Sequence, residues 1–406
     1  MMLGTKKLIR SLRLTNFLSF GPGSQEIPLE SLNVLVGANA AGKSNLIEAI
    51  DFLRMSHKDL LYPIRQGGGL EEWLWKGAVG IPVAEIDATV FYPSGIMPLR
   101  HKIAFTMRGQ RFELVDEAVE NEHPEAANLP DVRFYYRFYS GRPVISAYPD
   151  TSDGSGSNRS ERRLRREDIA LDQSILSQRR EPDLYPEITY LANEYAKIRI
   201  YRDWNLGRYT PPRIPQKADM PEDFLLEDTG NLGLVINHLE HQTGFRKLFL
   251  EKLKLFHDSF EDVSVKIHAG TVQVFLHEKG LASPVPATRL SDGTLRYLSL
   301  LTILCHPDPP PLVCIEEPEL GLHPDILPSL AELMIEASSR MQLVVTTQSD
   351  IFVDALTDIP EAVLVCDKED SATTMNRLDR KDLEAWLKKY ALGEVWRMGE
   401  IGGKRW

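Results

Sequence analysis

The sequence predicts an α/β fold with a mixed sheet, an antiparallel β subdomain and an inserted helical lid. Three observations lead to this fold class. A strand, a glycine-rich loop and a helix follow one another near the N-terminus, several short strand-like segments come next, and longer helical segments fill the middle of the chain. We therefore expect a first lobe at residues 1–165, a helical lid at residues 166–262 and a second lobe at residues 263–406.

The composition limits the class of protein. The longest apolar run, around Leu298 to Cys305, is far shorter than the roughly 20 residues that a membrane-spanning helix needs, and no signal-peptide pattern is found. We therefore expect a cytoplasmic protein without a membrane partner. The three cysteines lack metal-ligand spacing, which predicts buried thiols. A net charge of -11 argues against a cationic coat but leaves a local basic patch for DNA open.

The first strands lead directly into the glycine-rich loop. Leu8–Phe20, Gln25–Leu29 and Leu32–Val36, which is rich in leucine and β-branched residues, have strand composition, and the last of them leads into a glycine. Beyond the loop, apolar residues recur at helical spacing, which predicts a helix at about Lys43–Arg54. These apolar residues are Leu46, Ile47, Ile50 and Leu53.

The next segments predict the antiparallel subdomain and the lid. Short strand-like stretches separated by tight-turn residues indicate consecutive antiparallel strands. They are Ala84–Tyr92, Leu99–Met107, Arg111–Val115 and Val132–Tyr139. Helical periodicity is clearest in Leu232–Leu239 and Phe245–Phe256, within the predicted lid. A hairpin is expected around Ala269–Gly270, between Val263–His268 and Thr271–His277.

The loop Gly37–Ser44 fits the pattern G-x-x-x-x-G-K-[ST] at every fixed position. Its glycines let the backbone wrap around phosphates, so that several N–H groups point inward at a helix N-terminus. Lys43 would neutralise the β and γ phosphates, and Ser44 would place its hydroxyl on Mg²⁺. The alternative is a glycine-rich turn that binds nothing. We expect ATP contacts from Gly37, Asn39, Ala40, Ala41, Gly42, Lys43, Ser44 and Asn45.

A second cluster lies where the apolar strand Leu312–Ile315 runs into Glu316-Glu317-Pro318-Glu319. Acidic residues at the end of a buried strand predict a bound cation. Beside the loop described above, Glu316 would hold Mg²⁺, and Glu317 would polarise the water that attacks the γ-phosphate. The alternative is a solvated acidic turn. The role of Glu319 stays open.

The segment Ile315–Pro324 resembles the Walker B motif and D-loop of RecF-like, SMC-like and OLD-family ATPases, and the chain resembles bacterial AAA-type ATPases without a fused nuclease domain. The resemblance implies an ABC-type P-loop NTPase core. It also implies a signature motif, and Leu290–Thr294 stands at the expected place. By resemblance, Ser291 and Gly293 would contact ATP held by a second subunit, and His323 would join the nucleotide contacts. A plain helix cap is the alternative for Ser291.

Two glutamines are assigned through the same resemblance. The strand Gln342–Thr346 precedes Gln348, which stands where the family usually carries a switch histidine. Glutamine can donate a hydrogen bond to the γ-phosphate but cannot become positively charged, so we expect slow or partner-dependent hydrolysis. We assign the Q-loop glutamine, a metal contact, to Gln178. By the same resemblance, Glu316 stands where many relatives have aspartate, and Asp292 stands where transporters have glycine; both residues are compatible with the RecF-like branch.

Three other features have a structural and a functional interpretation. The run Arg162–Arg166 would contact nucleic-acid phosphates or begin a solvated helix, and we favour the helix start. For Arg199–Arg202 we favour a strand edge over a ligand-facing stripe. The tail Gly393–Trp406, rich in aromatic, basic and glycine residues, would dock on the core or on a partner.

The expected function is that of a dimeric, ATP-gated switch with ATP and Mg²⁺ as cofactors. Two chains would sandwich two ATP molecules, and a partner would respond to the change of state. Only about 55 residues follow Asp350, too few for a fused nuclease, so an effector nuclease would be a separate protein in antiphage defence or DNA maintenance. The alternative is a RecF-type DNA-repair ATPase that binds duplex DNA directly.

Overall fold

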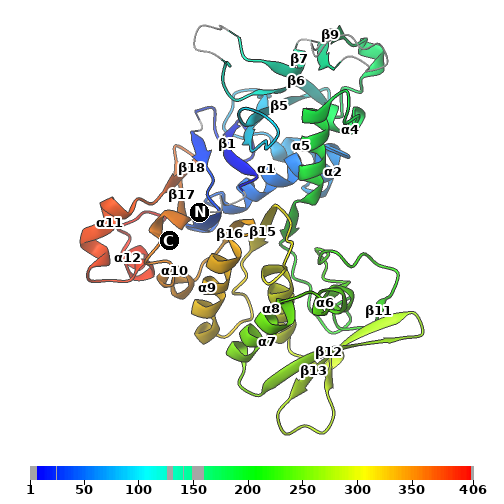
Figure 1. Ribbon diagram of the computed structural model, residues 1–406. Coiled ribbons are helices and arrows are strands. Elements are labelled where there is room, and N and C mark those ends of the chain that lie inside the picture. The colour runs from blue at the N-terminus through cyan, green and yellow to red at the C-terminus, as the bar shows by residue number, and fades with distance from the viewer. Residues whose placement is uncertain (1–6, 24, 126–130, 140, 149–159, 404–406) are drawn as a thin grey trace.

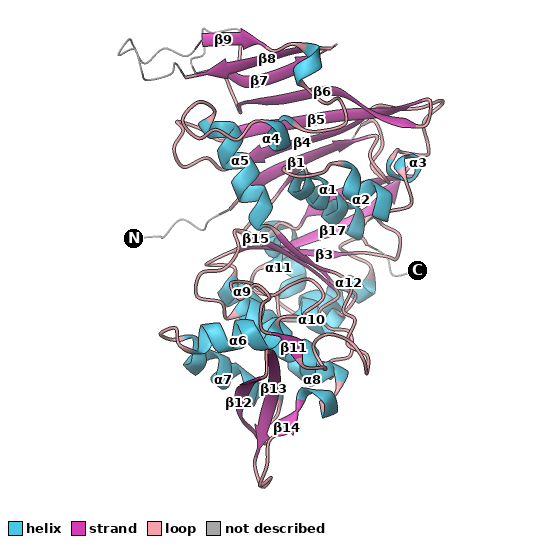
Figure 2. Cartoon of the chain, turned by 90° about the vertical axis from the view of Figure 1, so that its right-hand side faces the viewer, coloured by secondary structure: helices cyan, strands magenta, loops and turns pink. Residues whose placement is uncertain are grey.

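The computed structural model describes residues 7–23, 25–125, 131–139, 141–148 and 160–403. It has a mixed α/β architecture, with an eight-stranded sheet at one end, a six-stranded sheet in the middle and the lid at the other end (Figures 1 and 2). The predicted fold class is confirmed.

The six-stranded sheet carries the glycine-rich loop, and its strand order is β10-β15-β16-β3-β17-β18. The first five strands run parallel, and β18 pairs antiparallel with β17. Both faces of β3 are covered, so all five of its residues are buried, and four of them are apolar. The fifth, Asn33, donates to the Leu343 carbonyl of β16 at 3.0 Å. The bounds are β3 (Leu32–Val36), β10 (Arg199–Tyr201), β15 (Leu312–Glu316), β16 (Gln342–Thr346), β17 (Val363–Glu369) and β18 (Ala372–Arg377).

The eight-stranded sheet is antiparallel, as predicted, with the order β2-β1-β4-β5-β6-β7-β8-β9. Apolar residues alternate with polar ones along β1 and β4, because one face packs on the core and the other meets water. The bounds are β1 (Ile9–Thr15), β2 (Glu26–Pro28), β4 (Ala84–Val90), β5 (Leu99–Arg108), β6 (Arg111–Asn121), β7 (Phe134–Tyr139), β8 (Arg142–Ala147) and β9 (Ser160–Arg163).

Helix α1 (Lys43–Met55) lies between the two sheets and joins them into one hydrophobic core (Figure 2). Phe52 of α1 stacks on Phe105 of β5 with ring centroids 5.0 Å apart, and Leu35 of β3 belongs to the same core. Four further helices complete this first core: α2 (Leu61–Gln66), α3 (Leu70–Trp73), α4 (Ile175–Gln178) and α5 (Pro186–Lys197). The glycine-rich loop is therefore mounted on a rigid junction.

The predicted lid, residues 166–262, divides between two hydrophobic cores. Ile175 of α4 and Leu191 of α5 are buried in the first core. The rest packs in a second core, where α6 (Leu232–Glu240), α7 (Phe245–Phe256) and the later helix α8 (Asp292–Leu304) lie against a small sheet of β11 (Gln216–Lys217), β12 (Phe260–His268), β13 (Thr271–Glu278) and β14 (Val285–Pro286). The predicted hairpin at Ala269–Gly270 is confirmed.

The last part of the chain covers the second face of the six-stranded sheet. Helices α9 (Leu327–Ala337) and α10 (Asp350–Asp354) share a core with the lid, and α11 (Arg380–Leu387) and α12 (Leu392–Met398) follow β18. Cys305, Cys314 and Cys366 are free and buried, as predicted. Within the described ranges, no helix combines the length and the apolar character needed to cross a membrane.

Candidate functional site

The glycine-rich loop connects the carboxyl end of β3 to the first turn of α1, as predicted. Two of its glycines cannot be replaced without a clash. A Cβ atom on Gly37 would lie 2.3 Å from the Cys366 carbonyl oxygen, and one on Gly42 would lie 2.3 Å from Thr373 Oγ1. Gly42 also has a φ of 102°, in the region that favours glycine. Asn39 and Ala40 are exposed at the tip of the loop.

Lys43 points back across its own loop. Its Nζ donates hydrogen bonds to the carbonyl oxygens of Gly37 at 2.8 Å and Ala38 at 2.9 Å. The residue is only 7% exposed, and burial lowers the pKa of its ammonium, an effect that nearby Cys366 and Glu317 oppose. A cation is thus already placed inside the loop, where phosphate oxygens could replace the carbonyl groups as its partners.

A chain of hydrogen bonds supports the loop from below. Asn45 Nδ2 donates to Ser19 Oγ at 2.6 Å, Ser19 Oγ lies 2.6 Å from Thr373 Oγ1, and Thr373 Oγ1 donates to the Ala41 carbonyl at 2.9 Å. Asn45 therefore supports the loop through its side chain, and its contact with ATP stays a prediction. Sequence reasoning missed Ser19 and Thr373, since neither stands in a motif.

Two of the three residues predicted to hold a metal, Ser44 and Glu316, meet at the carboxyl edge of the sheet. Ser44 Oγ donates to Glu316 Oε2 at 3.1 Å, although the residues are 272 positions apart. Burial raises the pKa of Glu316, and the charge of Arg202 opposes this effect. A hydroxyl and a carboxylate suit Mg²⁺, which takes oxygen ligands and usually completes its shell with waters and phosphates. Within the described residues, no cluster of three His, Cys, Asp or Glu residues forms a metal cage.

Glu317 and Gln348, the two residues predicted to act in hydrolysis, are in contact. Gln348 Nε2 donates to Glu317 Oε1 at 2.6 Å. The Glu317 backbone has a φ of 45°, which is unusual for a residue with a side chain. Its N–H donates to the Thr346 carbonyl at 3.1 Å, and its carbonyl accepts from Arg296 Nη1 at 3.2 Å. These contacts keep the carboxylate at the carboxyl edge of the sheet.

Glu319, whose role the sequence left open, connects the acidic segment Glu316–Glu319 to Thr347 and Gln348, the residues that follow β16. Its Oε1 accepts from Thr347 Oγ1 at 2.7 Å and from the Gln348 N–H at 2.8 Å. Its Oε2 is buried without a hydrogen-bond partner. Burial raises the pKa of this carboxyl group, and the hydrogen bond from the Gln348 N–H opposes the effect. Glu319 therefore orients Thr347 and Gln348.

The residues after β10 form a wall of the site that sequence reasoning missed. Because β10 pairs parallel with β15, its carboxyl end opens beside Glu316. Trp204 Nε1 donates to the Glu316 carbonyl at 3.1 Å, and the Arg296 guanidinium lies over the Trp204 ring, 5.1 Å from its centroid. The charge of Asp203 contributes to the raised pKa of Glu316. Asp203 could have been found from the sequence, because it is an acidic residue that directly follows the predicted strand Arg199–Arg202.

Gln178 does not reach the site, and its assignment as a metal contact is corrected. Its Nε2 donates to the carbonyls of Ala170 at 3.2 Å and Gln173 at 3.0 Å, and its Oε1 accepts from the Ala170 N–H at 2.9 Å. Arg180, just beyond it, donates to the His57 carbonyl past the C-terminal end of α1. Since the loop Gly37–Ser44 lies at the other end of α1, Gln178 stabilises its own turn.

The predicted signature turn begins α8. Ser291 is the N-cap, and its Oγ accepts from the Thr294 N–H at 3.0 Å. A Cβ atom on Gly293 would lie 2.5 Å from the Gly321 carbonyl oxygen. The turn therefore packs closely against the loop that follows Glu319. Ser291 itself is exposed. His323 is also on the surface, 75% exposed, where its Nδ1 accepts from the Asp325 N–H at 3.3 Å.

The tail packs on the core as far as it is described. Trp396 Nε1 donates to the Gly403 carbonyl at 3.0 Å, and the Gly403 N–H donates to Asp367 Oδ2 at 2.7 Å. A Cβ atom on Gly403 would lie 3.2 Å from Gly37 Cα, so the tail contacts the start of the glycine-rich loop. Trp406 lies outside the described residues.

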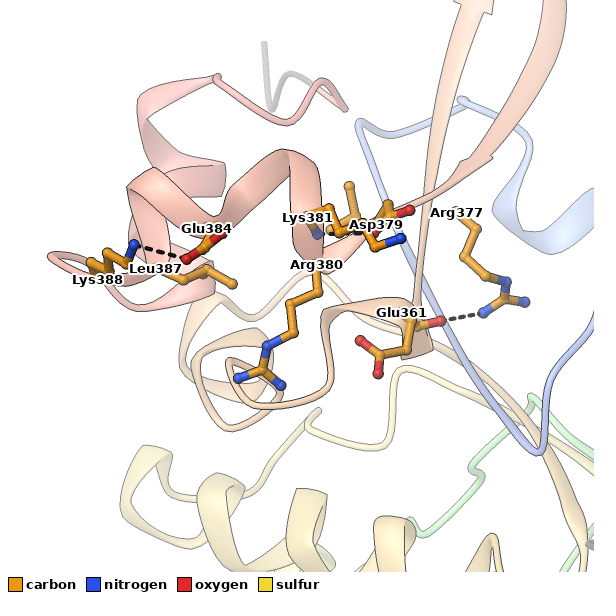
Figure 3. A pocket seen from close by; sticks show the side chains of 9 residues that line it. Glu361, Arg377, Asp379, Arg380, Lys381, Glu384, Leu387 and Lys388 are labelled. Atoms are coloured by element: carbon orange, nitrogen blue, oxygen red, sulfur yellow. Dashed lines mark hydrogen bonds and ion pairs between the residues drawn. The ribbon is translucent and has the colours of Figure 1, made fainter.

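A cavity of about 870 Å³ lies apart from this site, between α11 and the end of β18 (Figure 3). Charged side chains line it, and several already have partners. Arg377 donates to the Glu361 carbonyl at 2.7 Å, and Lys388 donates to Glu384 at 2.8 Å. No residue of the glycine-rich loop or the acidic segment lines this cavity.

Comparison with known proteins gives one family and several similar folds. The family described as "AAA domain, putative AbiEii toxin, Type IV TA system" matches residues 32–354. No curated protein matches the chain. The structure of an Smc head bound to the C-winged helix domain of ScpA is 15% identical, with a TM-score of 0.57, and the match covers 92% of this chain and 99% of that one.

A second solved structure agrees with the first. The Smc head domain with an extended coiled coil, bound to the C-terminal domain of ScpA from Pyrococcus furiosus, is 13% identical with a TM-score of 0.55. That match covers 94% of this chain and 99% of the other. At these identities the likeness concerns the fold, which is that of an ABC-type, SMC-like head.

Proposed function

Because the chain belongs to this AAA-domain family, we propose that it binds and hydrolyses ATP as a homodimeric, Mg²⁺-dependent switch. One observation carries the proposal. Ser44 Oγ and Glu316 Oε2 lie 3.1 Å apart, with the Lys43 ammonium inside the same loop. Elements distant in sequence thus bring together an anion site and a cation site, as a nucleotide with its metal requires.

Hydrolysis would depend on Glu317 and Gln348. The Glu317 carboxylate follows Glu316, the proposed metal ligand, directly in the chain and would accept a proton from the attacking water. Gln348 holds that carboxylate at 2.6 Å and remains neutral at every pH, so it adds no positive charge to the transition state. Slow turnover, or turnover stimulated by a partner, follows from this pair.

Dimerisation would complete each site. Ser291 and Asp292 are exposed at the N-terminus of α8, where backbone N–H groups and the helix dipole favour an anion. The γ-phosphate of ATP on a second chain is a ligand of this kind. Each ATP would then lie between the glycine-rich loop of one chain and the signature turn of the other.

For the biological role, we propose defence together with a separately encoded effector nuclease. The family description names a toxin of a type IV toxin–antitoxin system, which supports a role of this kind. The solved Smc heads are bound to domains of ScpA, and their fold supports a head that engages a partner protein. The trigger would be the change between monomer and ATP-bound dimer.

Direct binding of duplex DNA is the second candidate and has less support. Two cations on the outer face of the eight-stranded sheet are already paired with acids: Arg100 lies 2.6 Å from Asp87, and Lys102 lies 3.1 Å from Glu85. ATP-dependent affinity for DNA with a steep salt dependence would favour this candidate over the effector.

The proposal predicts that the wild-type chain dimerises only with nucleotide and metal. Sedimentation velocity should show a monomer without ATP, a dimer with ATP and Mg²⁺, and a monomer again once the metal is chelated, because each ATP joins two chains. Phosphate release should accompany dimerisation. A chain that stays monomeric with ATP, or hydrolyses none, would contradict the proposal.

A further inference from the structure

Arg213 is a buried arginine in the segment between β10 and β11, outside every motif discussed above. Its relative exposure is 7%. Burying a guanidinium is unfavourable unless its donors are paired, so an arginine in such a position is held by specific acceptors. The acceptors of Arg213 show what the residue holds in place.

Two of its three acceptors flank the signature serine. Arg213 Nη1 donates to the Leu290 carbonyl, and Arg213 Nη2 forms an ion pair with the Asp292 carboxylate. Ser291 lies between these two residues. The third acceptor is the Leu206 carbonyl, 2.7 Å from Arg213 Nε, which anchors the guanidinium to its own segment.

The contacts show what the Asp292 carboxylate does. Its side chain is 68% exposed, so packing does not require it. Its carboxylate lies in the first turn of α8, where the helix dipole favours a negative charge, and it completes the pairing of Arg213. The first turn of α8 is therefore fixed from the lid.

The same segment also reaches the chain's own site. Trp204, nine positions before Arg213, donates to the Glu316 carbonyl at 3.1 Å. The segment thus contacts the acidic cluster at one end and the signature turn at the other. A shift of one end would be transmitted to the other through packed backbone.

We propose that Arg213 is a positioning residue that orients Ser291 and Gly293 toward ATP held by the partner chain, with Asp292 as its counter-ion. The inference rests on the dimeric switch proposed above. Arg213 would therefore influence the binding of the ATP held by the partner chain, and not the binding of ATP to the glycine-rich loop of its own chain.

The test compares Arg213→Gln with Asp292→Asn, the double variant, and the control Arg246→Gln. Arg246 is a suitable control because it is also a lid arginine paired with an aspartate, Asp262 at 2.7 Å, but is 47% exposed. Two quantities are measured: ATP affinity at protein concentrations where the chain is monomeric, and the ATP-dependent dimerisation constant from sedimentation equilibrium.

Arg213→Gln should weaken ATP-dependent dimerisation about tenfold or more, since charge-assisted hydrogen bonds are lost, while monomer ATP affinity stays within about twofold. Asp292→Asn should act in the same direction and more weakly. The double variant should resemble Arg213→Gln, because the two residues form one interaction. Arg246→Gln should behave as the wild type.

Either of two results would overturn the inference. One is wild-type dimerisation by both Arg213→Gln and Asp292→Asn. The other is an equal loss of monomer ATP affinity, which would place the effect on the chain's own site. Because Asp292 is exposed, its variant keeps the test decisive if Arg213→Gln unfolds. Dimerisation of the wild-type chain is measured in the same experiment. If the wild type does not dimerise with ATP, the proposed function is contradicted together with the inference.

Discussion

Lys43→Ala is expected to abolish ATP binding at micromolar concentrations. Lys43 supplies the only side-chain cation of the described glycine-rich loop, and its Nζ already lies within 2.9 Å of two loop carbonyls. Removing it deletes a charge-assisted contact with the β and γ phosphates, and we expect a loss of about 100-fold or more in affinity. Isothermal titration calorimetry measures this loss directly.

Lys102→Ala is a matched control for that variant. Lys102 is also partly buried and paired with two acids, Glu85 at 3.1 Å and Asp116 at 3.3 Å, but it lies on the outer face of the eight-stranded sheet. Its removal should leave ATP affinity unchanged. Undiminished binding by a folded Lys43→Ala protein would contradict the assignment of the loop.

Glu317→Gln should retain ATP, lose hydrolysis and accumulate the dimer. An amide has the shape of the carboxylate but cannot accept the proton of the attacking water, and loss of a general base costs about 10²- to 10⁴-fold in rate. Lys43, Ser44 and Glu316 are untouched, so ATP should bind as in the wild type. Phosphate release and sedimentation with ATP and Mg²⁺ provide the two readouts.

The control for Glu317→Gln is Glu332→Gln. Glu332 is an exposed acid on α9, whose preceding loop leads from the same acidic segment. The Glu332→Gln protein should hydrolyse ATP at the wild-type rate. A Glu317→Gln protein with an unchanged rate would remove Glu317 from the role of base, and one that fails to bind ATP would show that the substitution damages the site itself.

The sequence allowed the local features of the site to be predicted. The strand Leu32–Val36 and the helix Phe245–Phe256 have the predicted bounds, because apolar periodicity and flanking glycines are local signals. The meeting of Ser44 and Glu316 was also predictable, since parallel strands open at the same edge of a sheet. These are the parts of the site that a motif describes.

The remaining features depend on contacts between distant segments. Ser19 and Thr373 support the loop from positions 354 residues apart, and no local pattern marks either. Gln178 was assigned because it precedes the helical region of the chain, whereas burial of α4 in the first core places it near the far end of α1. Arg213 belongs to no motif, and its proposed role depends on contacts with Leu290 and Asp292, which only the fold brings near it.

The central claim is that each ATP site is shared by two chains, and a mixing experiment tests it most directly. Lys43→Ala disables the glycine-rich loop and Ser291→Arg blocks the signature turn, so each variant alone should be inactive. A mixed dimer has one intact site, because the Ser291→Arg chain supplies an intact glycine-rich loop and the Lys43→Ala chain supplies an intact signature turn. Random pairing should restore about a quarter of the wild-type rate of ATP hydrolysis if the two sites act independently. A mixture no more active than the separate variants would contradict the claim.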